Sequence, residues 1–195
     1  VTMALLDIPG TKAPGQDGYG SQFYKDAWHI IGDEVTSAIQ SSYDTGMLLK
    51  QLNSTSISLI PKVELPENVT QFRPIACCNT MYKTLTKVLC ARLNKILPDI
   101  INPTQSAFIK GRDIVENVLI CQDLIRMYER GVCSLRILMQ LDVNKSYESV
   151  EWSFIDDMLV ELGFPERIHR LIMQCVSTPT YNFNITGVSF GFVTC

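Results

Sequence analysis

Residues 136–143, RILMQLDV, form a compact apolar run that is interrupted by Gln140 and ended by Asp142. Such a run is typical of a strand that is buried on both faces. Because an isolated buried carboxylate is costly, Asp142 must be paired, hydrogen-bonded or bound to a cation where the strand reaches solvent. The run therefore predicts a sheet with a candidate site at the tip of one strand.

Spacing alone leaves other roles open for these residues. Asp142 could instead cap a helix that begins near Asn144, because aspartate is a favoured N-cap residue. Tyr147 lies five residues after Asp142, where its ring could pack into the core or line a pocket. Core packing is the ordinary role of a tyrosine at such a position.

The remaining sequence alternates between helical and strand patterns. Helical spacing of apolar residues predicts helices over 21–45, 80–97, 114–128, 150–162 and 166–176, with Pro98 ending the second of them. Strand patterns occur over 54–61, 180–186 and 189–194, and the last two read as a hairpin. Residues 7–20 predict a loop rich in turns, and residues 62–76 an extended stretch punctuated by proline. Together these patterns indicate an α+β fold.

Charge is distributed unevenly along the 195 residues, although the formal net charge is only −3. Residues 62–112 hold eight basic side chains against three acidic ones, whereas residues 1–50 and 151–195 are acidic. The middle of the chain is therefore the candidate anion-facing region. Its basic residues are Lys62, Arg73, Lys83, Lys87, Arg92, Lys95, Lys110 and Arg112.

The cysteines and the hydropathy pattern point to an intracellular protein without a membrane segment. The seven cysteines have no C-x-x-C spacing and mostly lie among apolar residues, which favours reduced thiols over a disulfide framework or a zinc site. Uncharged apolar runs of eighteen residues are absent from the sequence, and so is a signal-peptide pattern. The chain begins at Val1 and ends at Cys195 within a predicted strand, so we expect it to be part of a longer protein.

Four ordered segments resemble one protein family. The longest of them covers residues 141–165 and reads LDVNKSYESVEWSFIDDMLVELGFP. It resembles the first catalytic palm motif of reverse transcriptases from plant-type non-LTR (LINE-like) retrotransposons. In that motif an aspartate precedes an aromatic residue by five positions. Three further segments resemble motifs of that family in the same order, namely KAPGQDG, the FRPI of residues 72–75, and QSAFIKGR. Four motifs at compatible spacing are more specific than any one alone.

The resemblance implies a right-hand polymerase fold, with an N-terminal extension and fingers over residues 1–130, mostly helical with a short β element. The palm would start at residues 131–195 and carry the first catalytic motif. The implied reaction is RNA-directed DNA synthesis, in which two Mg²⁺ ions assist nucleotidyl transfer. The implied partners are an RNA template, a DNA primer and deoxynucleoside triphosphates, with no membrane.

The resemblance also assigns roles to individual residues. Asp142 matches the catalytic metal ligand, with the Val143 carbonyl as a further oxygen for Mg²⁺. Tyr147 matches the aromatic beneath the sugar of the incoming nucleotide, and Arg73 would bind its triphosphate or the template backbone. Lys62 and Arg112 are weaker candidates for nucleic-acid contacts. For these last three, an ordinary solvated charge is an equally good interpretation.

The sequence departs from the family pattern at several positions. Gln16 replaces the expected proline, Ser146 replaces alanine and Glu148 replaces aspartate. The paired aspartates of the second palm motif do not occur within these 195 residues, so we expect this chain to be inactive and to bind Mg²⁺ weakly, if at all, by itself. The alternative is a non-catalytic remnant of a decayed retroelement that binds RNA or an RNA–DNA duplex. Acidic residues 156 and 157 are expected to form a solvated helix face.

Overall fold

The computed structural model describes residues 1–129, 137, 139–143, 149–185 and 188–194. It divides into two compact units. The first unit contains Val1–Leu89 and Glu151–Cys195, and the second contains Cys90–Val150. This grouping brings the C-terminal segment together with the N-terminal one. Each unit is described by itself below.

Helices build the core of the first unit. They are α1 (Thr2–Leu6), α2 (Ser21–Asp26), α3 (Trp28–Thr45), α4 (Thr80–Leu93), α7 (Trp152–Glu161) and α8 (Glu166–Ser177), and the last four residues of α4 belong to the second unit. The core consists mainly of Leu5, Ile39, Leu85 and Leu171, whose exposed fractions are 2% or less. Helix α8 packs against both α3 and α7. Its buried residues therefore connect the N-terminal segment of the first unit with the C-terminal segment.

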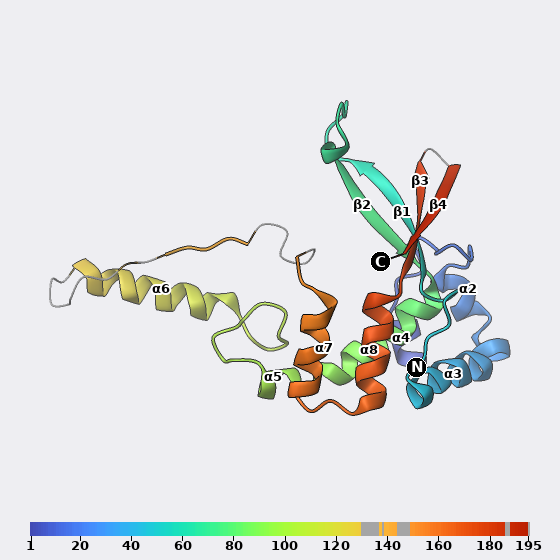
Figure 1. The fold of residues 1–195 in the computed structure, drawn as a ribbon, viewed down its shortest axis with the longest axis horizontal. Coiled ribbons are helices and arrows are strands. Elements are labelled where there is room, and N and C mark those ends of the chain that lie inside the picture. Colours follow the sequence, from blue (N-terminus) through green and yellow to red (C-terminus); the bar gives the residue numbers. More distant parts are fainter. Residues whose placement is uncertain (130–136, 138, 144–148, 186–187, 195) are drawn as a thin grey trace. The chain divides into compact units, whose positions relative to one another are not determined.

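A four-stranded mixed sheet rises from these helices (Figure 1). Its strands are β1 (Ser54–Pro61), β2 (Phe72–Cys78), β3 (Thr180–Ile185) and β4 (Val188–Thr194), in the order β2-β1-β3-β4. The pairs β1–β2 and β3–β4 are antiparallel hairpins, and the central pair β1–β3 is parallel. The fold is therefore mixed α/β, in agreement with the predicted class, while fingers and palm remain proposals for its parts.

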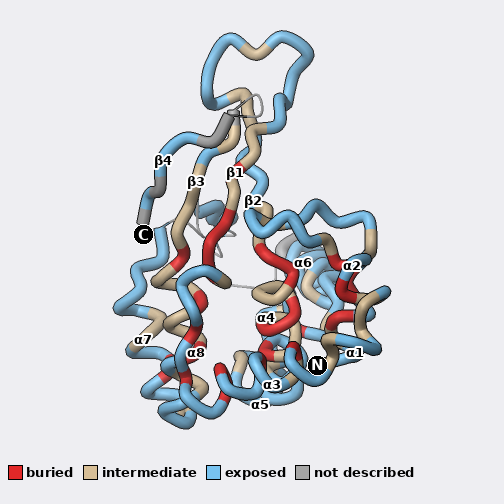
Figure 2. The backbone as a smooth tube through the Cα atoms, turned by 90° about the vertical axis from the view of Figure 1, so that its right-hand side faces the viewer, coloured by how far each residue is buried: buried red, intermediate tan, exposed pale blue. Residues whose placement is uncertain are grey.

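Burial falls along β1 towards its C-terminal end. Ser54, Thr55 and Ile57 are buried, whereas Ile60 is 50% exposed (Figure 2). The connection between β1 and β2 contains the short 3-10 helix η1 (Val69–Gln71) and is largely exposed. The β1–β2 hairpin thus extends from a buried base to a solvated tip.

The second unit is built around α5 (Leu97–Ile100) and α6 (Ile114–Glu129). Residues 101–113 form an irregular loop between these helices. None of the helices in the described part of the chain is long and apolar enough to cross a bilayer.

Most predicted elements are confirmed. The structure has the strand at 54–61, the C-terminal hairpin, and the helices predicted at 114–128, 150–162 and 166–176 within three residues at either end. The predicted helix over 21–45 is two helices, because Ala27 leaves the helical conformation with φ −86° and ψ 2°. Gly46 ends α3 in the left-handed conformation that glycine adopts readily, as its position predicts.

The structure refines one prediction that involves proline and contradicts another. The extended stretch over 62–76 includes strand β2, in which Pro74 lies opposite Leu59. This is compatible with the sheet because β2 is an edge strand, where a missing N–H leaves no neighbour unpaired. Helix α4 ends at Leu93, and Pro98 lies in the first turn of α5 instead of ending the preceding helix.

The prediction of a buried strand over residues 136–143 is wrong for the residues that the structure describes there. Residues 137 and 139–143 form no helix or strand, and Ile137, Met139 and Leu141 are 89%, 70% and 81% exposed. A strand requires a hydrogen-bonded neighbour, and the four strands in the described part of the chain all belong to the first unit. Residues 137 and 139–143 consequently have no strand partner in the part of the chain that the structure describes, although their composition is strand-like.

Candidate functional site

Asp142 lies on an exposed, irregular part of the second unit. Its side chain is solvated, and the following Val143 is 66% exposed. The next helix that the structure describes is α7, whose N-cap is Glu151. Tyr147, the predicted floor of the nucleotide site, lies outside the described residues, as does Asn144. Of the predicted site around Asp142, the structure therefore describes the Asp142 carboxylate and its neighbours within residues 139–143.

The donor types at Asp142 and Val143 suit a hard divalent cation, because Mg²⁺ prefers carboxylate and carbonyl oxygens. These two residues supply few oxygen ligands. Within residues 1–129 and the other described segments, no three acidic, histidine or cysteine side chains come together as a metal site. Asp142 and Val143 could therefore supply part of a coordination shell, and the other oxygens would have to come from elsewhere.

Arg73 lies on the edge strand β2, opposite Ile60 of β1. Its side chain is exposed and makes no hydrogen bond or ion pair with any residue that the structure describes. A guanidinium has five N–H donors in a fixed fork that matches two phosphate oxygens. Since internal contacts use none of them in the described structure, this fork is available to an external anion.

Lys62 follows directly on β1 and closes the β1–β2 connection. Its backbone N–H donates to the Gln71 carbonyl at 2.8 Å, and its Nζ donates to the Thr70 carbonyl at 2.9 Å. Lys62 and Arg73 therefore share one hairpin. Lys62 has a structural role at the hairpin tip, and its exposed ammonium retains further donors for a nucleic-acid contact.

Arg112 organises the loop between α5 and α6. Its Nη1 donates to the carbonyls of Asn102 and Gln105 at 2.7 and 2.8 Å, and its Nη2 donates to those of Pro98 and Ile101 at 2.9 and 3.0 Å. Four of the five guanidinium donors are thus engaged by backbone carbonyls. This bracing was not predicted, and it leaves only Nε–H for a phosphate.

The KAPGQDG segment forms a tight loop on the first unit, held at the start of α4. A Cβ on Gly15 would lie 2.5 Å from the backbone nitrogen of Asn79 and 2.6 Å from its Cα, so only glycine fits. Asp17 accepts a hydrogen bond from the Tyr19 N–H at 3.0 Å, and Gly18 adopts φ 75°. These contacts give the segment a structural role in fixing the chain as it enters α2.

Side chains of α4 hold the same N-terminal loop. Lys83 Nζ donates to the Ala13 carbonyl at 2.8 Å, and the Thr80 hydroxyl donates to the Tyr19 carbonyl at 2.9 Å. Lys87 forms an ion pair with Asp7, and this hydrogen bond and charge lower the pKa of the Asp7 carboxyl below its ordinary value of 3.8. Two of the basic residues in 62–112 are therefore engaged with the N-terminal segment.

An open pocket of about 450 Å³ lies where this loop meets the sheet. Ser54, at its wall, donates to Gln16 Oε1 at 2.6 Å, and Asn79 Nδ2 donates to the Gln51 carbonyl at 2.9 Å. The pocket is lined by Gln16, Asp17, Lys50, Gln51, Ser54, Asn79 and Thr180. Gln16 and Asp17 belong to the KAPGQDG segment, but none of the residues to which the resemblance assigns a catalytic, nucleotide-binding or nucleic-acid-binding role lines the pocket.

One pair of polar residues joins the two C-terminal helices of the first unit. His169 Nε2 of α8 lies 2.5 Å from Asp156 Oδ1 of α7, and their side chains are 20% and 49% exposed. Asp156 is half-exposed and Asp157 is exposed, in agreement with the expected solvated helix face, but the pairing of Asp156 with His169 was not predicted. The two partners are thirteen residues apart, so no local pattern signals the contact.

Comparisons with known proteins identify the family. Residues 60–195 match the family model described as reverse transcriptase (RNA-dependent DNA polymerase). A 149 kDa protein of transposon TX1 from Xenopus laevis is 29% identical over 164 residues, which are 84% of this chain and 12% of that protein. The Pol polyprotein of retrotransposable element R2 from Nasonia vitripennis is 25% identical over 83% of this chain and 15% of its own length.

A further R2 Pol polyprotein, from Bradysia coprophila, is 22% identical over 96% of this chain and 21% of its own length. The chain thus spans about a fifth or less of these relatives, which support the resemblance to non-LTR retrotransposon reverse transcriptases. Enzymes of this family use divalent metal ions. Because the family match covers 136 of the 195 residues and includes both Arg73 and Asp142, this chain belongs to the reverse transcriptase (RNA-dependent DNA polymerase) family.

Proposed function

We propose that this chain supplies the fingers, over residues 1–130, and the start of the palm, over residues 131–195, of an RNA-directed DNA polymerase from a plant-type non-LTR retrotransposon. The observation that carries the proposal is the single family match that runs through both the FRPI segment and Asp142. The solvated position of Asp142 supports it, because a metal-binding carboxylate must be reachable by cations and nucleotide. An intracellular location is part of the same proposal.

In this proposal, Asp142 and the Val143 carbonyl hold Mg²⁺, while Tyr147 forms the floor under the incoming sugar. The metal, when bound, favours deprotonation of the primer hydroxyl and balances charge on the leaving pyrophosphate. Arg73 holds phosphate oxygens of the nucleotide or the template, and Lys62 and Arg112 are secondary nucleic-acid contacts. RNA template, DNA primer and deoxynucleoside triphosphates are the proposed partners.

Replacing Arg73 tests the nucleic-acid part of the proposal in this chain itself. We expect Arg73→Ala to weaken binding of an RNA–DNA primer–template duplex roughly fivefold and to lower the slope of log K against log salt by about one, since one phosphate contact is lost. Arg73→Lys should keep the slope and recover part of the affinity, because lysine keeps the charge and loses the fork. Fluorescence anisotropy of a labelled duplex over a salt series measures both quantities.

The matched control is Arg126→Ala, which removes the same charge from an exposed position on α6. We expect its affinity and salt slope to equal those of the unchanged chain. If Arg73→Ala and Arg126→Ala behave alike, Arg73 is an ordinary surface charge and its proposed role is wrong.

The second candidate is a binding remnant without polymerase chemistry. It is favoured by exposed basic side chains, of which Arg73, Lys95 and Lys110 make no hydrogen bond or ion pair within the described residues. Both candidates predict salt-dependent binding. A primer-extension assay separates the two candidates. Only the first predicts RNA-templated DNA synthesis by a longer polypeptide that contains this chain.

A further inference from the structure

The turn over residues 15–18 carries a glutamine at a position that suits proline. The Gly18 N–H donates to the Gly15 carbonyl at 3.2 Å, so Gln16 is the second residue of a four-residue β-turn. Proline favours that position because its fixed φ matches the turn. The Gln16 N–H makes no hydrogen bond with any residue that the structure describes, so proline would leave no acceptor unpaired. The stability of the turn therefore does not account for glutamine here.

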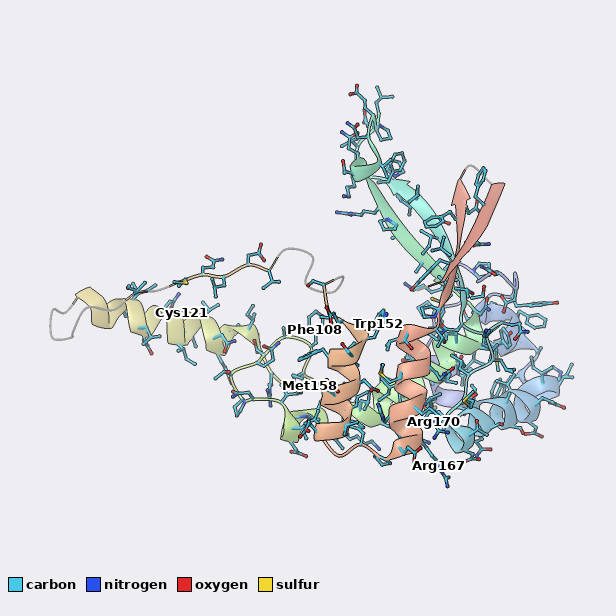
Figure 3. All side chains as sticks on the ribbon, in the orientation of Figure 1. Phe108, Cys121, Trp152, Met158, Arg167 and Arg170 are labelled. Atoms are coloured by element: carbon cyan, nitrogen blue, oxygen red, sulfur yellow. The ribbon has the colours of Figure 1, made fainter. Side chains whose placement is uncertain are left out.

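The Gln16 carboxamide instead lines the open pocket of about 450 Å³ at the base of the sheet. Its Oε1 accepts from the Ser54 hydroxyl at 2.6 Å, and Ser54 is only 9% exposed. Figure 3 shows the side chains of the N-terminal loop beside the base of the sheet, where this contact forms. Because Oε1 is engaged by β1, the Nε2 group keeps two N–H donors, and no described residue accepts from them.

Asp17 follows in the same turn and also lines the pocket. Its backbone N–H donates to Asn79 Oδ1 at 3.4 Å, and Asn79 is 3% exposed, so the turn is held against a buried residue. Asp17 Oδ1 accepts from the Tyr19 N–H at 3.0 Å, while Oδ2 accepts from none of the described residues. Two consecutive residues therefore offer an amide donor and a carboxylate acceptor to the same pocket.

The charge of the pocket indicates which class of ligand it fits. Asp17 and Lys50 are the two charged residues among the seven that line it, so their charges balance. A metal ion would meet the Lys50 ammonium, and a free anion would meet the Asp17 carboxylate. A neutral group that both donates and accepts suits this lining, and the ribose 2′-hydroxyl of RNA is such a group. A phosphate beside that ribose would suit the exposed Lys50.

Recognition of the sugar also fits a template better than recognition of a base. A site that bound one base by its edge would favour particular sequences, whereas the ribose is the same at every position of an RNA strand.

We propose that this pocket binds one ribonucleotide of a single-stranded RNA template. Gln16 Nε2 donates to the 2′-oxygen, the 2′-hydroxyl donates to Asp17, and Lys50 binds the adjoining phosphate. The inference rests on the proposed function, in which the chain binds an RNA template, and it assigns the preference for RNA over DNA to Gln16 and Asp17. The departure from proline at Gln16 thus supplies a contact that a proline could not make.

The experiment compares single-stranded RNA and DNA of the same sequence by fluorescence anisotropy. We expect the unchanged chain to bind the RNA roughly tenfold more tightly, since the 2′-hydroxyl bonds to a charged acceptor. RNA with 2′-O-methyl groups cannot donate and should bind as DNA does. Asp17→Asn and Gln16→Pro should each lower the ratio of RNA to DNA affinity roughly threefold or more.

Stability measurements and a matched control accompany these variants. Gln16→Pro should keep or raise the melting temperature, because proline suits the turn. Asp33→Asn, which removes an exposed carboxylate of α3 outside this pocket, should leave the ratio of RNA to DNA affinity unchanged. Lys50→Ala should weaken RNA and DNA binding alike and lower the salt slope by about one.

Equal affinity of the unchanged chain for RNA and DNA would overturn the inference. So would an RNA preference that Gln16→Pro retains in full, even if Asp17→Asn failed to fold, or a preference that follows the base sequence instead of the sugar. If one of these results occurs while Arg73→Ala still weakens duplex binding, only this inference fails. If the unchanged chain binds neither single strands nor duplex, the inference and the proposed nucleic-acid binding fail together.

Discussion

Asp142→Asn is expected to abolish RNA-templated primer extension by a polypeptide that contains this chain. The substitution keeps the size of the side chain and removes its charge, so a metal-ligating carboxylate becomes a weak neutral ligand. Metal-ion catalysis contributes several kcal/mol to such reactions, which corresponds to a loss on the order of a thousandfold or more. The measurement is the rate of primer extension on an RNA template with Mg²⁺.

Asp157→Asn is the matched control for that experiment. Asp157 is an exposed aspartate of α7, and its replacement makes the same chemical change outside the proposed site. We expect its extension rate to stay close to that of the unchanged protein. Extension by Asp142→Asn at the rate of the control would show that Asp142 is not a metal ligand.

Leu171→Ala is expected to cause a large loss of stability. Leu171 is fully buried on α8, which packs against α3 and α7 and so links the two ends of the chain. Removing a buried leucine side chain leaves a cavity and costs about 2–5 kcal/mol of unfolding free energy. For a chain of this size we expect the melting temperature to fall by roughly 5–15 °C. Thermal unfolding followed by circular dichroism measures the change.

Val160→Ala, at a position on α7 that is 58% exposed, serves as the control for Leu171→Ala. Exposed substitutions away from special contacts usually change stability by no more than about 0.5 kcal/mol. If both variants melt at the temperature of the unchanged chain, α8 does not form the core contact described above.

Elements with a strong local pattern could be predicted from the sequence. The alternation of Ile57 and Leu59 located β1, and helical spacing located α7 and α8. Gly46 ended α3 as its position indicated. These features depend on residues close together in the chain, where apolar spacing and backbone preference act directly.

Tertiary context decided the features that local pattern missed. Pro74 is accommodated because β2 lies at the sheet edge, which the sequence does not reveal. The apolar run 136–143 has a strand-like composition, but composition cannot supply the neighbouring strand that a ladder requires. The break at Ala27 was also missed, because alanine itself favours a helix and gives no local signal of an interruption.

For the candidate site as well, some features could be predicted from the sequence and others depend on tertiary contacts. Sequence motifs predicted the family, which the family match confirms, because motifs depend on residue identity and order. The roles that the motifs suggest for Asp142 and Arg73 stay predictions. The motifs did not indicate that the Arg112 guanidinium is engaged by four backbone carbonyls, or that Gly15 packs closely on Asn79. Those contacts depend on backbone conformation in loops, for which the sequence carries little periodic signal.

The most direct test of metal binding by Asp142 is a change of metal preference. A thiolate suits softer transition-series cations better than Mg²⁺, so the ligand chemistry can be altered at this one position. For Asp142→Cys in a polypeptide that contains this chain, we predict no RNA-templated extension with Mg²⁺ and a measurable return of extension with Mn²⁺. Equal activity with the two metals, or activity with Mg²⁺ alone, would contradict the assignment of Asp142 as the metal-binding carboxylate of a reverse transcriptase.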